Sequence, residues 1–181
     1  MSENIPQEVN ALSPEVQAYI REQIRICQTT TPMEGFKLFA ESEEFIPKYN
    51  KIGDSGFDLR ANIPSSITVQ PGERVLIGTG LYTELPIGFE IQVRPRSGMA
   101  KNYGGGVVNA PGTIDSNYRH EIGVIFINTD ARDPIHIARG DRIAQGVVCR
   151  VERVNFQIVP NVEDLSDSER GTDGFGSSGV K

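Results

Sequence analysis

Four short segments of the sequence combine residue types that can bind an anion or move a proton. In the first, residues 94–100 (RPRSGMA), a proline turn presents Arg96 and Ser97 beside Gly98. A guanidinium fork, a hydroxyl and backbone N–H groups left accessible by a glycine can bind phosphate together. The segment therefore predicts a phosphate clamp, and the alternative is a surface turn with solvated arginines.

The second segment, residues 109–121 (NAPGTIDSNYRHE), has Pro and Gly at the bend of a predicted hairpin. Asp115 precedes Tyr118 by three residues. A carboxylate at this position can orient and deprotonate a water, and a tyrosine ring can pack flat against a sugar. Aspartate also caps turns, so a catalytic base and a turn cap both remain open as interpretations.

The third segment, residues 53–61 (GDSGFDLRA), places Asp58 in the middle of a predicted strand, where carboxylates are uncommon. A carboxylate in such a position needs a partner. Arg60 lies two residues later on the same face of the strand, so an internal ion pair is one interpretation. The other is that Asp58 supports a hydrated Mg²⁺.

The fourth segment, residues 169–179 (ERGTDGFGSSG), lies in a C-terminal stretch rich in Ser, Asp and Gly, which predicts a mobile tail. Ordering glycines costs conformational entropy, so a tail with one Arg, one Phe and paired Ser suits a segment that closes over a ligand. Arg170, Ser177 and Ser178 can then bind phosphate while Phe175 stacks on a base. A disordered tail is the alternative.

Short β-strands must position these segments. From Phe36 onward, runs rich in Val, Ile, Phe and Thr are interrupted by Gly or Pro at short intervals, which is typical of an all-β protein. So many short strands favour a sandwich, barrel or jelly roll, because an open sheet would leave long unpaired edges. The predicted strands are 36–39, 55–60, 66–69, 74–80, 81–84, 89–94, 107–109, 112–114, 122–128, 135–137, 142–150 and 155–159.

The residues before these strands predict one amphipathic helix over 13–27. Ser13 can cap it with Pro14 at its first position, and residues 29–35 (TTTPMEG) end it. Its apolar face at helical spacing consists of Val16, Tyr19, Ile20, Ile24 and Cys27.

Composition limits the function classes. The chain has 181 residues, 38% apolar and 23% charged, which is the profile of one globular domain. It has no run of about 20 apolar residues and no secretory signal, so we expect a cytoplasmic protein without a membrane partner. A net charge of −6 opposes stable nucleic-acid binding, so any phosphate must be bound in a discrete pocket.

Several common site types are missing from the sequence. Two Cys and two His in no paired spacing argue against a disulfide scaffold and a structural zinc site. The P-loop pattern, a dinucleotide fingerprint between strand and helix, the zinc deaminase pattern and the GxSxG elbow are also absent. The four segments above must therefore supply the chemistry.

Together with GDRIAQ at residues 140–145, these segments resemble, in order and spacing, the five motifs of the all-β homotrimeric dUTPases. The resemblance covers residues 36–180. It implies a jelly-roll-like β-barrel of short strands over 35–163, the dUTPase-like β-clip. It also implies an N-terminal extension with one helix over 1–34 and a mobile C-terminal tail over 164–181 that closes over the active site.

The activity that the resemblance implies is Mg²⁺-assisted hydrolysis of dUTP to dUMP and pyrophosphate, which limits uracil in DNA and supplies dUMP for dTMP synthesis. Asp115 is then the base that activates the water attacking the α-phosphorus, in active sites shared between the subunits of a homotrimer. The other implied roles are phosphate binding by Arg96, Ser97, Gly98, Gln145, Arg170, Ser177 and Ser178; uracil and deoxyribose binding by Asn109, Gly112, Thr113, Ile114, Tyr118 and Phe175; and Mg²⁺ binding through water by Asp58.

The sequence departs from the family pattern at three positions and leaves two alternatives. His120 and Asp173 stand where glycine is usual, and Gly146 stands where a large aliphatic residue is usual, which leaves the local core packing open. One alternative is a dCTP deaminase of the same fold, for which Glu121 is the hairpin carboxylate that can serve. The other is a nucleotide-switched regulatory protein that binds a partner through its N-terminal helix.

Overall fold

The computed structural model describes residues 7–29, 35–51, 53–169 and 171 of the chain. The chain divides into two compact units, residues 1–151 and 152–181. Within the described residues, all β-strands and both α-helices belong to the first unit, and the second contains one turn of 3₁₀-helix, η3 (Val162–Asp164). No helix among the described residues is long and apolar enough to cross a membrane.

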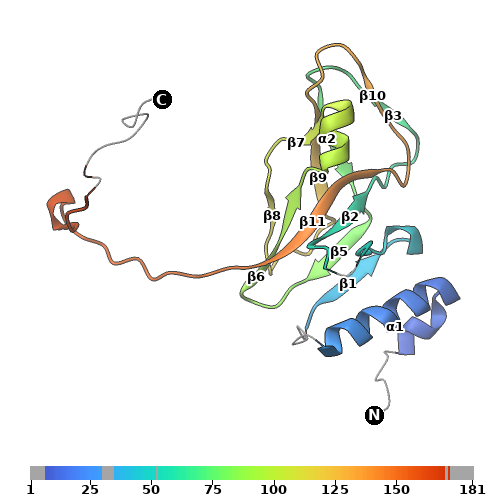
Figure 1. The fold of residues 1–181 in the computed structure, drawn as a ribbon, viewed down its shortest axis with the longest axis horizontal. Coiled ribbons are helices and arrows are strands. Elements are labelled where there is room, and N and C mark those ends of the chain that lie inside the picture. Colours follow the sequence, from blue (N-terminus) through green and yellow to red (C-terminus); the bar gives the residue numbers. More distant parts are fainter. Residues whose placement is uncertain (1–6, 30–34, 52, 170, 172–181) are drawn as a thin grey trace. The chain divides into compact units, whose positions relative to one another are not determined.

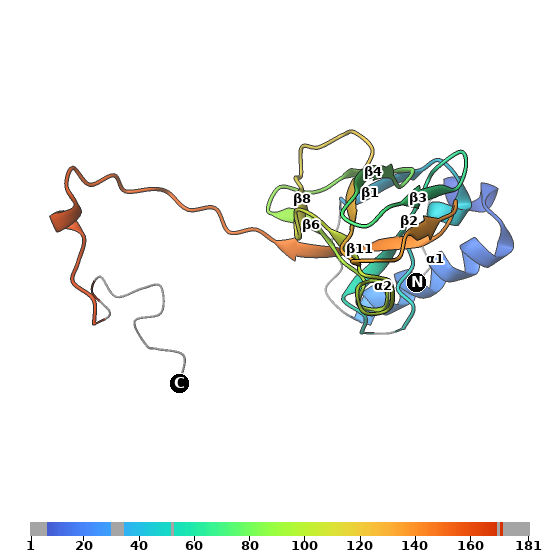
Figure 2. The same ribbon diagram turned by 90° about the horizontal axis from the view of Figure 1, so that it is seen from above.

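The first unit is mainly β (Figures 1 and 2). Its largest sheet has the order β2-β11-β6-β8, a second has the order β4-β9-β7, and β1-β5 and β10-β3 form two-stranded ribbons. Every pairing is antiparallel. The strands are β1 (Lys37–Ala40), β2 (Gly56–Arg60), β3 (Ile67–Val69), β4 (Arg74–Gly78), β5 (Leu81–Glu84), β6 (Phe89–Arg94), β7 (Gly105–Val107), β8 (Gly112–Ile114), β9 (Gly123–Asn128), β10 (Ile135–Ile137) and β11 (Arg142–Arg150).

The strands bury one face because apolar residues alternate along them. In β2, Phe57 and Leu59 are buried, whereas Gly56, Asp58 and Arg60 are only partly buried. Each fully buried large side chain contributes roughly 1.5–3 kcal/mol to the stability of the fold. Because the core face stabilises the strands in this way, the opposite face can carry polar groups. The largest fully buried side chains are Phe45, Phe126, Leu59, Ile77, Leu81, Ile91, Ile122, Ile137, Ile143, Val69, Val93 and Val124.

Gly146 is buried in β11 directly opposite Phe57 of β2. A Cβ atom at position 146 would lie 2.5 Å from Cε2 and 2.6 Å from Cζ of Phe57. The Phe57 ring therefore occupies the space that an aliphatic side chain at 146 would need. The core is filled at this point from the neighbouring strand.

Helix α1 (Pro14–Thr29) confirms the predicted N-terminal helix and extends two residues further. Val16 is buried and Tyr19 and Ile20 are half-buried, as the predicted apolar face requires; the side chains of Ile24 and Cys27 lie outside the described residues. The 3₁₀-helix η1 (Gln7–Ala11) precedes it, and η2 (Glu43–Phe45) follows β1.

A second helix, α2 (Ser97–Tyr103), forms where the sequence predicts a turn. It begins directly after Arg96 and ends at Gly104, whose φ of 69° is a left-handed conformation that glycine adopts without strain. Its seven residues make about two turns. The clamp segment is therefore a turn followed by a short helix.

Three predicted strands differ from the structure by two residues or more. The strand predicted at 74–80 ends at Gly78. The strand predicted at 107–109 is found at Gly105–Val107. The strand predicted at 155–159 is absent: residues 151–160 have no regular structure, and Phe156 and Ile158 are 88% and 92% exposed. A strand needs a hydrogen-bonded neighbour, and no described strand of this chain pairs with the segment.

Candidate functional site

Strand register brings three distant segments together on the outer face of the main sheet. Asp58 of β2 lies opposite Gln145 of β11, and Gln145 lies opposite Arg94 of β6. These residues alternate with the core residues of their strands, so their side chains share the face that points away from the core. The pairing thus places the segments 53–61, 140–145 and 94–100 side by side.

Asp58 is the centre of a charged cluster on this face. Its Oδ1 accepts a hydrogen bond from Arg96 Nε at 2.7 Å, and its Oδ2 accepts from Arg142 Nη1 and Asn50 Nδ2, both at 3.3 Å. Arg60, the partner suggested by the sequence, instead donates from Nη1 to the carbonyl oxygen of Gly140 at 2.8 Å. The ion pair of Asp58 is therefore formed with Arg96 and Arg142, and the interpretation that pairs it with Arg60 is wrong.

The surroundings of Asp58 keep its carboxylate ionised. Burial raises its pKa, but the hydrogen bond from Asn50 and the positive charges of Arg96 and Arg142 outweigh burial, so the pKa lies below its ordinary value of 3.8. The side chain is only 14% exposed, and that of Arg96 is 24% exposed. At neutral pH the carboxylate is an anion that holds the Arg96 guanidinium at the surface of the sheet.

A pocket of about 350 Å³ opens beside this cluster, and we call it the phosphate pocket after the residues predicted to bind phosphate. All four phosphate-binding residues predicted within the described part of the chain line it: Arg96, Ser97, Gly98 and Gln145. Its remaining lining residues are Asn50, Asp54, Ser55, Gly56, Asp58, Arg94 and Val147.

One contact and one open space shape the pocket. Gln145 Nε2 donates to the carbonyl oxygen of Pro95 at 2.8 Å, which ties β11 to the clamp segment. Apart from its chain neighbours and the backbone of its own helix, no atom lies within 4 Å of the position of a Cβ at Gly98, so the space beside the start of α2 is open. The predicted tail residues Arg170, Phe175, Ser177 and Ser178, and also Asp173, lie outside the described residues.

The pocket fits a hydrated Mg²⁺ better than a directly coordinated one. Both carboxylate oxygens of Asp58 already accept hydrogen bonds from cationic or amide donors. Among the residues that the structure describes, no group of three or more His, Cys, Asp or Glu could hold a metal ion. Mg²⁺ commonly keeps several waters and binds through one or two carboxylates plus substrate phosphates, and Asp58 with Asp54 can supply such carboxylates.

A second pocket, of about 400 Å³, lies at the predicted hairpin. All five base- and sugar-binding residues predicted within the described part of the chain line it: Asn109, Gly112, Thr113, Ile114 and Tyr118. The other lining residues are Leu76, Gly78, Val93, Glu121, Gly123 and Ile125.

Local contacts fix the shape of this hairpin pocket. A Cβ at Gly112 would lie 3.2 Å from Asn109 Nδ2, so the glycine allows Asn109 to approach the backbone of β8 closely. Tyr118 donates its hydroxyl proton to the carbonyl oxygen of Glu121 at 3.0 Å, which fixes the orientation of the half-buried ring. The His120 ring lies against it, with centroids 5.9 Å apart.

Glu121 is a lining residue whose position gives it a structural task. Its Oε1 accepts a hydrogen bond from the backbone N–H of Gly80 at 2.6 Å, and its side chain occupies the space where a Cβ at Gly78 would stand. The carboxylate that a deaminase would need is thus bound to the main chain in this structure. The sequence signal for this contact is Gly78, whose missing Cβ leaves room for the carboxylate.

Asp115 directly follows β8 and is exposed. Its backbone carbonyl accepts a hydrogen bond from the N–H of Tyr118 at 3.1 Å, which closes the turn between them. Its neighbour Ile114 and Tyr118 both line the hairpin pocket, whereas Asp115 lines neither pocket. Asp115 therefore lies at the end of β8, next to the lining of the hairpin pocket but not part of it.

The two pockets share no described residue. Val93 and Arg94 are neighbours in β6 and point to opposite faces of the strand, and each lines a different pocket. The hairpin pocket and the phosphate pocket therefore lie on opposite sides of the sheet at β6.

Comparisons with known proteins find relatives of this chain. The family model described as dUTPase matches residues 42–179. The deoxyuridine 5'-triphosphate nucleotidohydrolase of Anaeromyxobacter sp. (strain Fw109-5) is 53% identical over 134 residues, which cover 74% of this chain and 87% of that protein.

Solved structures show the same fold. A mutant dUTPase of Staphylococcus bacteriophage 80alpha with dUpNHpp has a TM-score of 0.69 at 24% identity, covering 82% of this chain and 100% of that one. A mutant dUTPase from phage phi11 of S. aureus, described for the coordination of a structural Mg(II) ion, has a TM-score of 0.62 at 19% identity, covering 71% of this chain and 99% of that one.

Proposed function

The chain belongs to the dUTPase family and hydrolyses dUTP, and we propose that the phosphate pocket and the hairpin pocket are the two parts of its active site. One observation carries this proposal. Every described residue predicted for phosphate binding lines one pocket, and every described residue predicted for uracil or deoxyribose binding lines the other. This division of the predicted residues between two pockets supports the proposal.

The proposed reaction is attack of water on the α-phosphorus of dUTP. Asp115 accepts a proton from the water as its oxygen bonds to the α-phosphorus. The bond from this phosphorus to the oxygen bridging to the β-phosphate breaks, which releases pyrophosphate and leaves dUMP. A general base of this kind supplies about 10² to 10⁴ of the rate, and positioning and charge stabilisation supply the rest.

The phosphate pocket provides the charge stabilisation. Arg96 offers a guanidinium and Ser97 a hydroxyl, and the open backbone at Gly98 lets phosphate oxygens approach. Asp58 holds the Arg96 guanidinium through Nε, and Arg96 Nη1 donates to the carbonyl oxygen of Arg142 at 3.3 Å, so Nη2 is the terminal nitrogen left to face the substrate. When bound, Mg²⁺ would neutralise phosphate charge and withdraw electrons from phosphorus, with Asp58 holding it through water.

The hairpin pocket provides specificity. The Tyr118 ring, oriented by its hydrogen bond to Glu121, packs beneath the deoxyribose and leaves no room for a 2′-hydroxyl. Asn109 and the backbone of residues 112–114 approach the base closely, which excludes the 5-methyl group of thymine and mismatches the amino group of cytosine.

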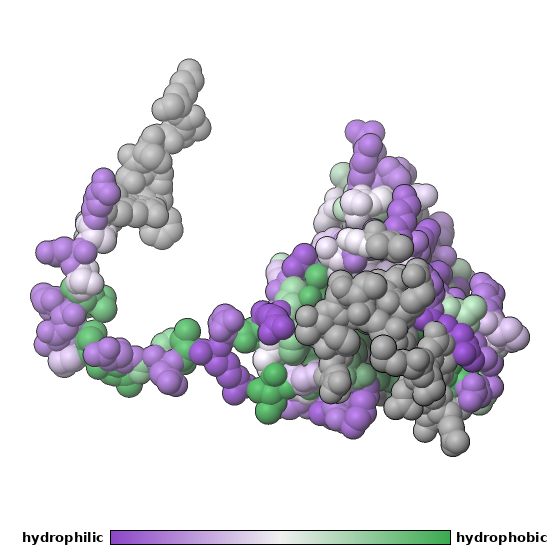
Figure 3. All heavy atoms as spheres, turned by 60° about the horizontal axis from the view of Figure 1, so that its bottom comes forward, coloured by the Kyte–Doolittle hydropathy of each residue, from purple (hydrophilic) through white to green (hydrophobic). Residues whose placement is uncertain are grey.

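The separation of the pockets supports active sites shared between the subunits of a homotrimer. Because the pockets share no described residue and lie on opposite sides of β6, one dUTP would take its base pocket from one subunit and its phosphate pocket from another. The second unit also offers contact surface: Val154, Phe156 and Ile158 are exposed at every second residue of an extended segment (Figure 3). In the proposed assembly, such residues are covered by a neighbouring subunit.

The same proposal includes the finer features that the family implies. The sheets over 35–163 close into a jelly-roll-like barrel, residues 1–34 form an extension, and the tail over 164–181 covers the bound nucleotide. Arg170, Ser177 and Ser178 then bind the γ-phosphate and Phe175 covers the uracil. We expect the trimer to act in the cytoplasm, where it limits uracil in DNA and supplies dUMP for dTMP synthesis.

Pyrophosphate release from dUTP, dCTP, dTTP and UTP with Mg²⁺ tests the proposed site. We expect turnover of dUTP alone, a loss of about 10² or more in kcat for Asp115→Asn, and wild-type turnover for Asp133→Asn, which changes an exposed carboxylate in the β9–β10 turn. Full activity of Asp115→Asn would refute the base assignment, and ammonia release from dCTP would favour the deaminase. Sedimentation as a stable monomer would refute the shared site.

A further inference from the structure

Helix α1 lies outside the residues that the family model matches, and yet it is anchored to the loop beside the phosphate pocket. The backbone N–H of Ser13 donates to Glu43 Oε1 at 2.8 Å, and the backbone N–H of Tyr49 donates to the Tyr19 hydroxyl oxygen at 2.9 Å. Lys48 Nζ lies 5.6 Å from the centre of the Tyr19 ring. Helix α1 is therefore attached to residues 43–49 at three points.

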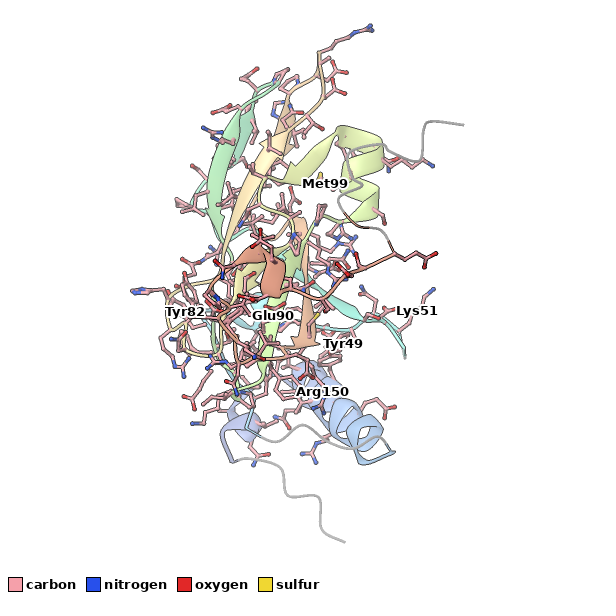
Figure 4. The ribbon with its side chains drawn as sticks, turned by 90° about the vertical axis from the view of Figure 1, so that its left-hand side faces the viewer. Tyr49, Lys51, Tyr82, Glu90, Met99 and Arg150 are labelled. Atoms are coloured by element: carbon pink, nitrogen blue, oxygen red, sulfur yellow. The ribbon has the colours of Figure 1, made fainter. Side chains whose placement is uncertain are left out.

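The same loop reaches the phosphate pocket at its other end. The Tyr49 ring packs edge-on against Phe57, with centroids 5.9 Å apart, and Asn50 Nδ2 donates to Asp58 Oδ2 at 3.3 Å. In Figure 4, Tyr49 lies beside helix α1 and Lys51 lies further along the same loop. Asn50 itself lines the phosphate pocket. Two hydrogen bonds and one peptide unit thus connect the Tyr19 hydroxyl to the carboxylate that holds Arg96.

We propose that Tyr19 of helix α1 is a positioning residue for the phosphate pocket: its hydroxyl fixes the backbone at Tyr49, so that the Asn50 side chain stays on Asp58 and Asp58 keeps Arg96 directed at the substrate phosphates. This inference rests on the proposed role of Asp58 and Arg96 in phosphate binding. It gives the N-terminal helix a part in the reaction without any contact between the helix and the nucleotide.

The loop needs such an anchor because it has little structure of its own. The residues between η2 and β2 form no helix or strand among those described, and Asn50 is exposed. Among the described residues, Lys51 and Asp54 hydrogen-bond to each other across the turn, Lys51 N–H to Asp54 Oδ2 at 2.9 Å and Asp54 N–H to the Lys51 carbonyl oxygen at 3.2 Å. Holding a side chain in one place from such a loop costs conformational entropy, which a fixed backbone at Tyr49 reduces.

The Tyr19→Phe variant removes the acceptor and keeps the ring over which Lys48 lies. In the unliganded protein, we expect amide hydrogen exchange at Tyr49, resolved by NMR, to become at least about fivefold faster, because the Tyr19 hydroxyl no longer accepts the hydrogen bond from its N–H. Exchange at Ile91 in the core should stay unchanged, which shows that the variant is folded. We also expect about two- to fivefold weaker binding of the imido analogue dUpNHpp, by calorimetry with and without Mg²⁺.

Three further variants make the test specific. Tyr82→Phe removes a tyrosine hydroxyl that donates to Glu41 Oε1 at 3.1 Å, away from both pockets, and should bind the analogue like the wild type. Asn50→Ala should weaken binding as Tyr19→Phe does. The affinity of the double variant for the analogue should equal that of the single variant that binds it less tightly, because both substitutions act through one contact. Asp58→Ala should weaken binding more than either.

Four results would overturn the proposed role of Tyr19. Unchanged exchange at Tyr49 in Tyr19→Phe overturns the inference, and so does faster exchange with wild-type affinity, since helix α1 would then hold the loop without affecting the pocket. Additive losses in the Tyr19→Phe/Asn50→Ala double variant would show that Tyr19 acts by another route. If Asp58→Ala binds the analogue like the wild type, the proposed role of Asp58 is wrong and the inference fails with it.

Discussion

Replacing Asp58 by asparagine tests the charged cluster of the phosphate pocket. Asparagine has the same shape and keeps one acceptor oxygen, but it removes the negative charge between Arg96 and Arg142. The hydrogen bond to Arg96 is short, at 2.7 Å, and both side chains are largely buried, so it should contribute about 1.5–3 kcal/mol. The Arg142 side chain is 47% exposed, so its longer contact adds at most about 1 kcal/mol.

From these contacts we expect Asp58→Asn to lose about 2 kcal/mol of stability at pH 7, because Arg96 stays largely buried without a counterion. For a chain of this length, that corresponds to a Tm lower by about 4–8 °C. The matched control is Asp167→Asn, which changes an exposed carboxylate of the second unit and should unfold like the wild type.

The pH dependence of the loss identifies its cause. The folded-state pKa of Asp58 lies below its ordinary value, so its contribution is fully present above the unfolded pKa of about 3.8 and disappears as pH falls through the lower folded value. The stability difference between wild type and variant should therefore be constant from about pH 7 to pH 5 and shrink below about pH 4.

Urea unfolding at pH 7, 5 and 3 measures this difference, at one fixed protomer concentration because association changes apparent stability. A double-mutant cycle with Arg96→Gln should give a coupling energy of about 1–2 kcal/mol. The reasoning is refuted if the two losses are additive within about 0.5 kcal/mol, or if the difference at pH 3 equals that at pH 7.

Two other sites allow equally direct tests. Gly146→Val should destabilise the protein by about 1–3 kcal/mol, because its Cβ would lie 2.5 Å from the Phe57 ring. Adding Phe57→Leu should restore part of the lost stability. An unchanged Tm for Gly146→Val would contradict the packing of Gly146 against Phe57. Tyr118→Phe removes the hydrogen bond to the Glu121 carbonyl and keeps the ring, so KM for dUTP should rise about two- to tenfold with kcat nearly unchanged. Steady-state kinetics measure both constants. An unchanged KM would mean that the hydroxyl does not orient the ring.

Much of the β framework can be predicted from the sequence because it follows from local patterns. Short runs rich in Val, Ile, Phe and Thr between Gly and Pro placed β2, β6, β8, β10 and β11 within one residue of their observed bounds. Ser13, Pro14 and the helical spacing after them predicted α1 in the same way. The short helix α2 was missed because Ser97 and Gly98 are as typical of a turn as of a helix start.

Site residues could be predicted where their chemistry lies within one motif. Arg96, Ser97 and Gly98 are adjacent, so residue type and spacing grouped them, and Tyr118 was singled out with Asp115 in one hairpin; Asn109 was added by the resemblance to the dUTPase motifs. The sequence did not predict that Asn50 and Glu121 line the pockets. It also did not predict that Asn50 donates a hydrogen bond to Asp58, or that Glu121 accepts one from the backbone of Gly80. Each of these bonds joins residues of different segments, which no local spacing records.

The sequence by itself determined most of the strands, the segments that can carry the chemistry and the family that the chain resembles, since these depend on residue type and short-range spacing. Only the tertiary structure decided that Asp58 pairs with Arg96, 38 residues away, and not with Arg60 two residues away. It also decided that Phe57 fills the space at Gly146 and that α1 holds the loop at Tyr49. The physical reason is that strand register and docking arise from pairing across the whole chain, and local preferences do not specify which partner a side chain will meet.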